Sequence, residues 1–82
     1  SWSDVGSWSS VWEISDKDEH GNARIGDVWS HNTENCYLHA ESKIIAAVGV
    51  KDLIIIETHD GVMVTQKSCD QDVKKIVEQL IE

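Results

Sequence analysis

Five short runs rich in Ile, Val and Thr follow one another between residues 28 and 67, and they constrain the fold more than any other feature. The runs are Val28–Ser30, Cys36–Ala40, Lys43–Val50, Leu53–Thr58 and Val62–Lys67. Such residues favour strands, and the connections between the runs are too short for the crossover helices that parallel neighbours usually need. The sequence therefore predicts either an antiparallel sheet or the short rungs of a solenoid, a partial β-helix.

Two details refine this β-rich middle. Thr58-His59-Asp60-Gly61 is a good tight turn, because Asp and Gly tolerate positive φ, so the runs on either side of it are predicted to form a hairpin. The apolar residues of Ile54–Ile56 are consecutive rather than alternating. This pattern predicts a strand that is covered on both faces.

A short helix is predicted at the N-terminus, over Ser7–Ser15. Trp8, Val11 and Trp12 have the spacing of one helix face, and Ser7 is a suitable N-cap. The polar stretch Asp16–Asp27 contains two glycines and is predicted to be a loop with one short strand at Ala23–Ile25.

The last segment predicts an amphipathic helix. Its apolar stripe consists of Val73, Ile76, Val77, Leu80 and Ile81. Ser68 and Gln71 fit a capping box, and Asp70 lies where the dipole of this helix favours an acid. We expect the stripe to pack on the sheet, which makes the fold class α+β: a short N-terminal helix, a compact β-rich middle and a C-terminal helix.

Size and charge exclude several classes of protein. Eighty-two residues make one small domain, and 15 acidic against 7 basic residues give a net charge of -8. This charge disfavours non-specific binding to nucleic acid or to anionic membranes.

The most apolar stretch, Ile44–Ile56, is interrupted by Lys51 and Asp52 and is too short to cross a bilayer. Two cysteines are too few for a disulfide framework, so we expect a cytoplasmic protein.

Few residues suggest catalysis. Cys36 and His39 are close in sequence, but a separation of three places them on opposite faces of a strand. A zinc site could draw on His31, Cys36, His39, His59 and Cys69. The spacings typical of structural zinc sites are absent from the sequence, however, so turn histidines and small core cysteines are the favoured interpretation.

The N-terminal tryptophans and Asp4 each allow two interpretations. Trp2, Trp8 and Trp12 could form a ligand platform, but their large apolar area favours a role in the core. Asp4 precedes the predicted helix among apolar neighbours. It could cap that helix, or it could bind a hard cation such as Mg²⁺ together with substrate phosphates.

Several blocks in a fixed order resemble the bacterial mannose-1-phosphate guanylyltransferases, the GDP-mannose pyrophosphorylases. They are SWSDVGSW at residues 1–8, VWE at 11–13, GDV at 26–28, NC at 35–36, GVKDLIIIET at 49–58 and QDVKKIVEQL at 71–80. The resemblance covers nearly the whole chain. It implies that residues 1–25 correspond to the end of the nucleotidyltransferase domain, and residues 26–82 to a β-helix-like extension with a C-terminal helix.

The resemblance also implies which chemistry is present and which is missing. Asp4 matches the family aspartate that is expected to help hold the catalytic metal, Mg²⁺ in the full-length enzymes. The Gly-rich nucleotide loop, the guanine pocket and the sugar-phosphate site of the family have no counterpart in these residues. We therefore expect the chain by itself to be inactive, with no cofactor of its own and with GTP and mannose 1-phosphate bound only in a full-length protein.

Two hypotheses remain open at this point. The chain is either a fragment of a guanylyltransferase or a free-standing interaction module of the same ancestry. A fragment should leave Trp2, Trp8 and Trp12 exposed or covered by another copy, whereas a module should bury them within the monomer. In either case we expect a homo-oligomer that forms through the tryptophan surface or through strand edges.

Overall fold

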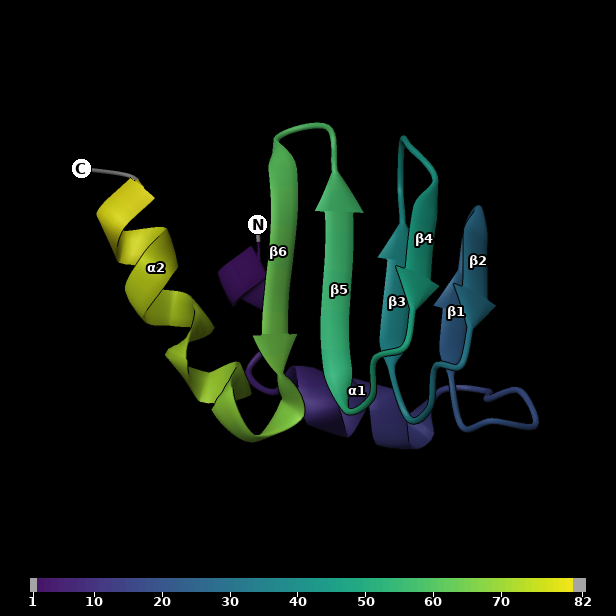
Figure 1. Ribbon diagram of the computed structural model, residues 1–82. Helices are drawn as coiled ribbons and strands as arrows, with labels where there is room; N and C mark the ends of the chain where they lie inside the picture. The colour runs from purple at the N-terminus through teal and green to yellow at the C-terminus, as the bar shows by residue number, and fades with distance from the viewer. Residues whose placement is uncertain (1, 81–82) are drawn as a thin grey trace.

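The computed structural model describes residues 2–80, and its elements follow the predicted order (Figure 1). They are the 3₁₀ helix η1 (Trp2–Asp4), α1 (Trp8–Ile14), β1 (Ala23–Ile25), β2 (Val28–His31), β3 (Tyr37–Ala40), β4 (Ile45–Val48), β5 (Leu53–Thr58), β6 (Gly61–Gln66), the 3₁₀ helix η2 (Lys67–Asp72) and α2 (Val73–Leu80). The predicted α+β class is confirmed.

The strands wind into a short solenoid. One side is a sheet in the order β1-β3-β5-β6, and a second side is the pair β2-β4. A single parallel bridge between Glu34 and Lys51 lies on the remaining side. The pairs β1-β3, β3-β5 and β2-β4 are all parallel. The solenoid alternative is therefore the correct one, and the antiparallel alternative holds only for the predicted hairpin of β5 and β6.

Left-handed backbone conformations mark the corners of the coil. Their φ values are 82° at Gly26, 49° at Asn32, 56° at Asn35, 66° at Gly49 and 59° at Asp52. Glycine and asparagine adopt this region at low cost, and aspartate tolerates it better than most residues. These residues allow the chain to turn sharply between strands only a few residues long.

Two hydrophobic cores lie on the two faces of the larger sheet. The inner core fills the coil and includes Cys36, Leu38 and Ile45. The outer core lies under the helices and includes Trp8, Tyr37, Ile54, Ile56, Met63 and Val73. Strand β5 contributes Ile54 and Ile56 to the outer core, while Leu53 and Ile55 pack against the inner one. Strand β5 thus packs against a core on each face, as predicted, although Leu53 and Ile55 on the inner face are only partly buried.

Helix α1 forms where it was predicted and packs behind the larger sheet in Figure 1. The side chain of Ser7 accepts a hydrogen bond of 3.2 Å from the amide of Ser10, which confirms Ser7 as the N-cap. None of the helices within residues 2–80 is long and apolar enough to span a membrane.

The C-terminal segment departs from its prediction. Ser68 is not an N-cap, because it lies inside η2, which follows Gln66 and precedes α2. The stripe is covered only in part: Val73 is buried and Val77 packs against the outer core, but Ile76 and Leu80 are 46% and 64% exposed. Helix α2 diverges from the end of β6 rather than lying across the sheet (Figure 1). No described strand therefore covers Ile76 and Leu80. Ile81 lies outside the described residues.

Candidate functional site

Asp4 ends the 3₁₀ helix η1 and its side chain is exposed. The cap of α1 is Ser7, so the prediction that Asp4 caps this helix is wrong. Its apolar neighbours Trp2 and Val5 pack against the outer core, whereas Asp4 itself is exposed. The metal role of Asp4 stays a prediction.

Beside η1 lies a small groove of about 170 Å³, lined by Trp2, Ser3, Val5, Gly6, Asp70, Gln71, Val73 and Lys74. Its acid, Asp70, is 7% exposed and is already engaged. Asp70 Oδ2 accepts hydrogen bonds from Ser7 Oγ at 3.0 Å, Ser9 N at 2.9 Å and Ser9 Oγ at 2.8 Å. Burial raises the pKa of Asp70, but these hydrogen bonds outweigh it, so the pKa lies below its ordinary value.

Asp70 does not lie where its sequence neighbours predicted. We expected this acid to serve the dipole of its own C-terminal helix, but it lies at the N-terminus of α1, 61 residues away from Ser9. It therefore joins the first and last segments of the chain. A carboxylate already bonded three times for this purpose is poorly placed to supply a second metal ligand.

The three N-terminal tryptophans belong to the core, as predicted. Trp8 is 8% exposed, its ring centroid lies 5.8 Å from that of Tyr37, and its Nε1 donates to Trp2 O at 3.0 Å. Trp2 and Trp12 are partly buried against the same core. The outcome expected of a fragment, tryptophans that are exposed or covered by another copy, is wrong for this chain. The N-terminal segment finds its packing surface on the β-rich part of the same chain.

Trp12 also holds two lysines near its ring. Lys67 Nζ lies 3.1 Å and Lys17 Nζ 4.7 Å from the ring centroid, and Trp12 Nε1 donates to Gly21 O at 2.9 Å. The indole thus links α1, the following loop and the beginning of η2 by cation–π contacts and one hydrogen bond. These contacts give Trp12 a structural role.

The histidines and cysteines do not come together. Cys36 lies in the inner core, whereas His39 contacts Tyr37 on the outer face at a centroid distance of 6.3 Å. The prediction of opposite faces is confirmed. Within residues 2–80, no three side chains of His, Cys, Asp or Glu converge as a metal site would require. His31, His59 and Cys69 are exposed, so the set considered for zinc is dispersed over the surface and the core.

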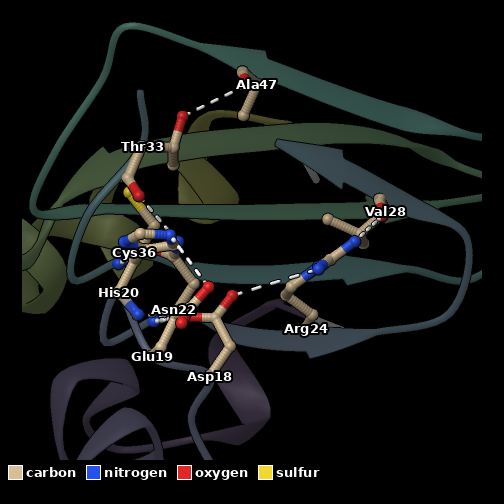
Figure 2. A network of polar contacts seen from close by, with 9 residues as sticks. All are labelled: Asp18, Glu19, His20, Asn22, Arg24, Val28, Thr33, Cys36 and Ala47. Carbon is tan, nitrogen blue, oxygen red and sulfur yellow. Dashed lines mark hydrogen bonds and ion pairs between the residues drawn. The ribbon is translucent and has the colours of Figure 1, made fainter. Parts of the chain in front are cut away.

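Sequence reasoning missed two buried polar groups. Asn22 is 1% exposed and lies inside the first coil (Figure 2), where its Nδ2 donates to Thr33 O at 2.8 Å and its Oδ1 accepts from Cys36 N at 2.9 Å. Thr33 Oγ1 donates to Ala47 O at 3.1 Å in the next coil. The side chains of Asn22 and Thr33 thus provide hydrogen-bond partners for backbone N–H and C=O groups of the coil. An asparagine in a polar loop gives no signal of this role.

Glu57 is the second buried group, at 4% exposed. Its carboxylate accepts hydrogen bonds from the hydroxyl of Ser42, from Ser42 N at 2.8 Å and from Lys43 N at 2.7 Å. The hydrogen bond from the Ser42 side chain, followed by that from the Lys43 backbone, lowers the pKa of Glu57 to about 2. An acid that ends the apolar run LIIIE was the available clue that it has internal partners.

Comparison with known proteins agrees with this architecture. Residues 26–80 match the family model described as the MannoseP isomerase/GMP-like beta-helix domain. The chain belongs to this family. The match covers the solenoid from its first corner at Gly26 to the end of α2.

Individual relatives of the β-helix family extend the likeness to the N-terminal segment. The chain is 66% identical over 79 residues to a mannose-1-phosphate guanylyltransferase of Salmonella montevideo and 56% identical over 77 residues to one of Klebsiella pneumoniae. These alignments cover 96% and 94% of the chain, but only 17% and 16% of the relatives. The chain thus spans about a sixth of the length of the curated relatives it matches.

A solved structure shows the same fold. The crystal structure described as a mannose-1-phosphate geranyltransferase from Thermus thermophilus superposes with a TM-score of 0.81 at 26% identity, covering 96% of this chain and 24% of that one. The resemblance to guanylyltransferases inferred from the ordered sequence blocks is confirmed: the chain matches a segment of these proteins.

Proposed function

We propose that these residues are the β-helix part of a mannose-1-phosphate guanylyltransferase, which converts GTP and mannose 1-phosphate to GDP-mannose and pyrophosphate. The observation that supports this most is 66% identity over 79 residues to one such protein. Residues 1–25 then correspond to the end of the nucleotidyltransferase domain and residues 26–82 to its extension. A cytoplasmic location suits such a protein, because its nucleotide substrate is made there.

The role of the segment in this proposal is structural. A phosphoryl-transfer site needs a cradle for the nucleotide phosphates and ligands for a metal. The described residues offer neither a Gly-rich phosphate loop nor a converging set of metal ligands. The coil and its two cores supply a rigid body that positions Asp4 at one edge.

Asp4 is the residue of this chain that we assign to the metal. Its exposed carboxylate fits a hard cation such as Mg²⁺, which accepts one or two protein carboxylates and completes its shell with water and phosphate oxygens. The remaining ligands would come from the substrates and from outside these residues. When bound, the cation neutralises charge on the reacting phosphates.

The experiment is a substitution in the full-length guanylyltransferase that contains this segment. Asp4→Asn should lower kcat/KM for GDP-mannose formation by about 100-fold or more, since an amide binds Mg²⁺ weakly, and excess Mn²⁺ should restore part of the loss. Asp16→Asn, at another exposed acid, is the matched control and should leave activity unchanged. Full activity of the Asp4→Asn enzyme would refute the metal role. Measurable activity of the 82-residue chain alone would refute the structural role.

One observation favours a second candidate, a free-standing interaction module. Trp2, Trp8 and Trp12 pack within the chain, so the segment has the self-contained core that such a module requires. The two candidates predict different genes. A free-standing module would be encoded without a nucleotidyltransferase domain, so the coding sequence that flanks this segment decides between them.

A further inference from the structure

The two tryptophans of α1 use their indole N–H groups in opposite directions along the chain. Trp8 Nε1 donates to Trp2 O at 3.0 Å, six residues before it, and Trp12 Nε1 donates to Gly21 O at 2.9 Å, nine residues after it. The bond from Trp12 belongs to the loop that leads to β1. The bond from Trp8 instead holds the first residue of η1, the 3₁₀ turn that ends at Asp4.

The position of η1 depends on side-chain contacts, because its link to α1 is not packed. Gly6 is exposed in this link, and a Cβ there would meet nothing within 4 Å. Val5 packs against the outer core, and Trp2 Cη2 would lie 3.4 Å from a Cβ on Gly61 of β6. Trp2 Nε1 is buried without a hydrogen-bond partner among the described residues, so packing holds this ring. The hydrogen bond from Trp8 adds the direction that apolar packing lacks.

Trp8 is itself fixed by two parts of the β-rich body. Its ring is buried, with its centroid 5.8 Å from that of Tyr37 on β3. Trp8 also lies between Ser7 and Ser9, whose hydroxyls and the Ser9 amide donate to Asp70 of η2. A side chain that is locked by packing and by its neighbours' hydrogen bonds can hold a further group precisely. The indole therefore ties the position of η1 to β3 and η2.

We propose that Trp8 is a positioning residue for Asp4, because its indole N–H fixes the turn that carries the Asp4 carboxylate. This role rests on the proposed function, in which Asp4 binds the metal ion. A ligand on a loosely held turn pays for the ordering of that turn when it binds, whereas a turn that is held in advance avoids this cost. Asp70 supports the same arrangement from the β-helix extension, so the extension contributes to the metal site through α1.

Titration of the full-length guanylyltransferase with Mn²⁺, followed by electron paramagnetic resonance, tests this proposal. Saturating GDP-mannose without pyrophosphate supplies phosphate oxygens and prevents turnover. Trp8→Phe keeps an aromatic ring but removes the donor, and it should raise the Kd for Mn²⁺ about fivefold or more, because one hydrogen bond no longer orders the turn. The number of Mn²⁺ sites per enzyme should stay the same. A loss of folded protein would instead lower the number of sites, since unfolded molecules lack the site.

Trp12→Phe is the matched control. It removes an equivalent indole N–H from the same helix, one that donates to Gly21 rather than to η1. Its Kd for Mn²⁺ should equal that of the wild type. Should Trp8→Phe fail to fold, replacement of Trp8 by 3-benzothienylalanine keeps the shape of the two rings, lacks the N–H donor and must give the same increase in Kd.

Asp4→Asn in the same titration separates the positioning role from the function on which it rests. Weaker Mn²⁺ binding by Asp4→Asn, together with wild-type binding by Trp8→Phe, would overturn the role of Trp8 and leave the metal role of Asp4 intact. Wild-type binding by Asp4→Asn would refute the metal role and the role of Trp8 with it. An equal increase in Kd for Trp8→Phe and Trp12→Phe would also overturn the proposal, because it would show a general loosening of α1.

Discussion

Glu57 shows how a single side chain stabilises a corner of the coil. It follows Ile56 on β5, yet its carboxylate points into the turn before β4 and binds two consecutive amides and a hydroxyl. Buried backbone amides without a partner would destabilise this turn. The anionic form is the one that accepts these hydrogen bonds, so the turn depends on the ionisation of Glu57.

This dependence predicts how stability changes with pH. The pKa of Glu57 is about 2 in the folded chain, below its ordinary value of 4.5. Its contribution is therefore complete above pH 4.5 and is lost as the pH falls toward 2. Urea unfolding at several pH values should show the wild type losing stability over this range more steeply than Glu57→Gln, which has no charge to lose.

Glu41→Gln is the control for Glu57→Gln, because Glu41 is an exposed acid of the same turn. Its unfolding curves should follow those of the wild type at every pH. A stability difference between wild type and Glu57→Gln that is the same at pH 7 and pH 2 would contradict the role assigned to the ionised carboxylate.

At the scale of the strand corners, glycine acts in two separable ways. Gly26 and Gly49 both have positive φ, 82° and 66°. A Cβ on Gly26 would lie 1.9 Å from the carbonyl oxygen of Ala40 in the next coil, whereas a Cβ on Gly49 would meet nothing within 4 Å. The first glycine allows a turn and a close approach of two coils, and the second allows only a turn.

Alanine substitutions should separate these two effects. Gly49→Ala should lower the free energy of unfolding by about 1 kcal/mol, the cost of a left-handed alanine. Gly26→Ala adds a backbone collision and should cost at least about 3 kcal/mol. Chemical denaturation of both variants measures the difference. Equal losses would show that the coils are not in contact at Gly26.

For the whole molecule, the N-terminal helix and the C-terminal segment are tied to one β-rich body. Trp8 packs on Tyr37 of β3, and Asp70 of η2 accepts three hydrogen bonds from Ser7, the N-cap of α1, and from Ser9 in its first turn. Segments joined by buried contacts of this kind unfold together in small domains. The chain should therefore behave as one cooperative unit.

Urea unfolding followed by two probes tests this cooperativity. Tryptophan fluorescence reports mainly on the N-terminal segment and far-UV circular dichroism on all of the secondary structure, and their midpoints should coincide. Asp70→Asn removes the charge that accepts the three hydrogen bonds and should lower the free energy of unfolding seen by both probes together, by about 1–3 kcal/mol. A fluorescence transition at lower urea than the circular dichroism transition would show that the N-terminal segment unfolds by itself.

Local patterns in the sequence determined the elements. The spacing of Trp8, Val11 and Trp12 with Ser7 before them predicted α1, the Asp60-Gly61 turn predicted the hairpin, and the apolar run of Ile54–Ile56 predicted a strand covered on both faces. These features depend on residues close together in the chain, so periodicity and turn chemistry suffice to find them. The same holds for Cys36 and His39, whose opposite faces follow from strand geometry alone.

Tertiary structure alone decided how the elements are joined. Short strands allowed both an antiparallel sheet and a coil, and the choice depends on corners such as Gly26 and Asn32, whose backbone conformation no local pattern specifies. The roles of Asp70, Asn22 and Glu57 depend on partners between 11 and 63 residues away. A hydrogen bond across such a separation forms only after the coil has brought both groups together, so the residue type by itself does not reveal it.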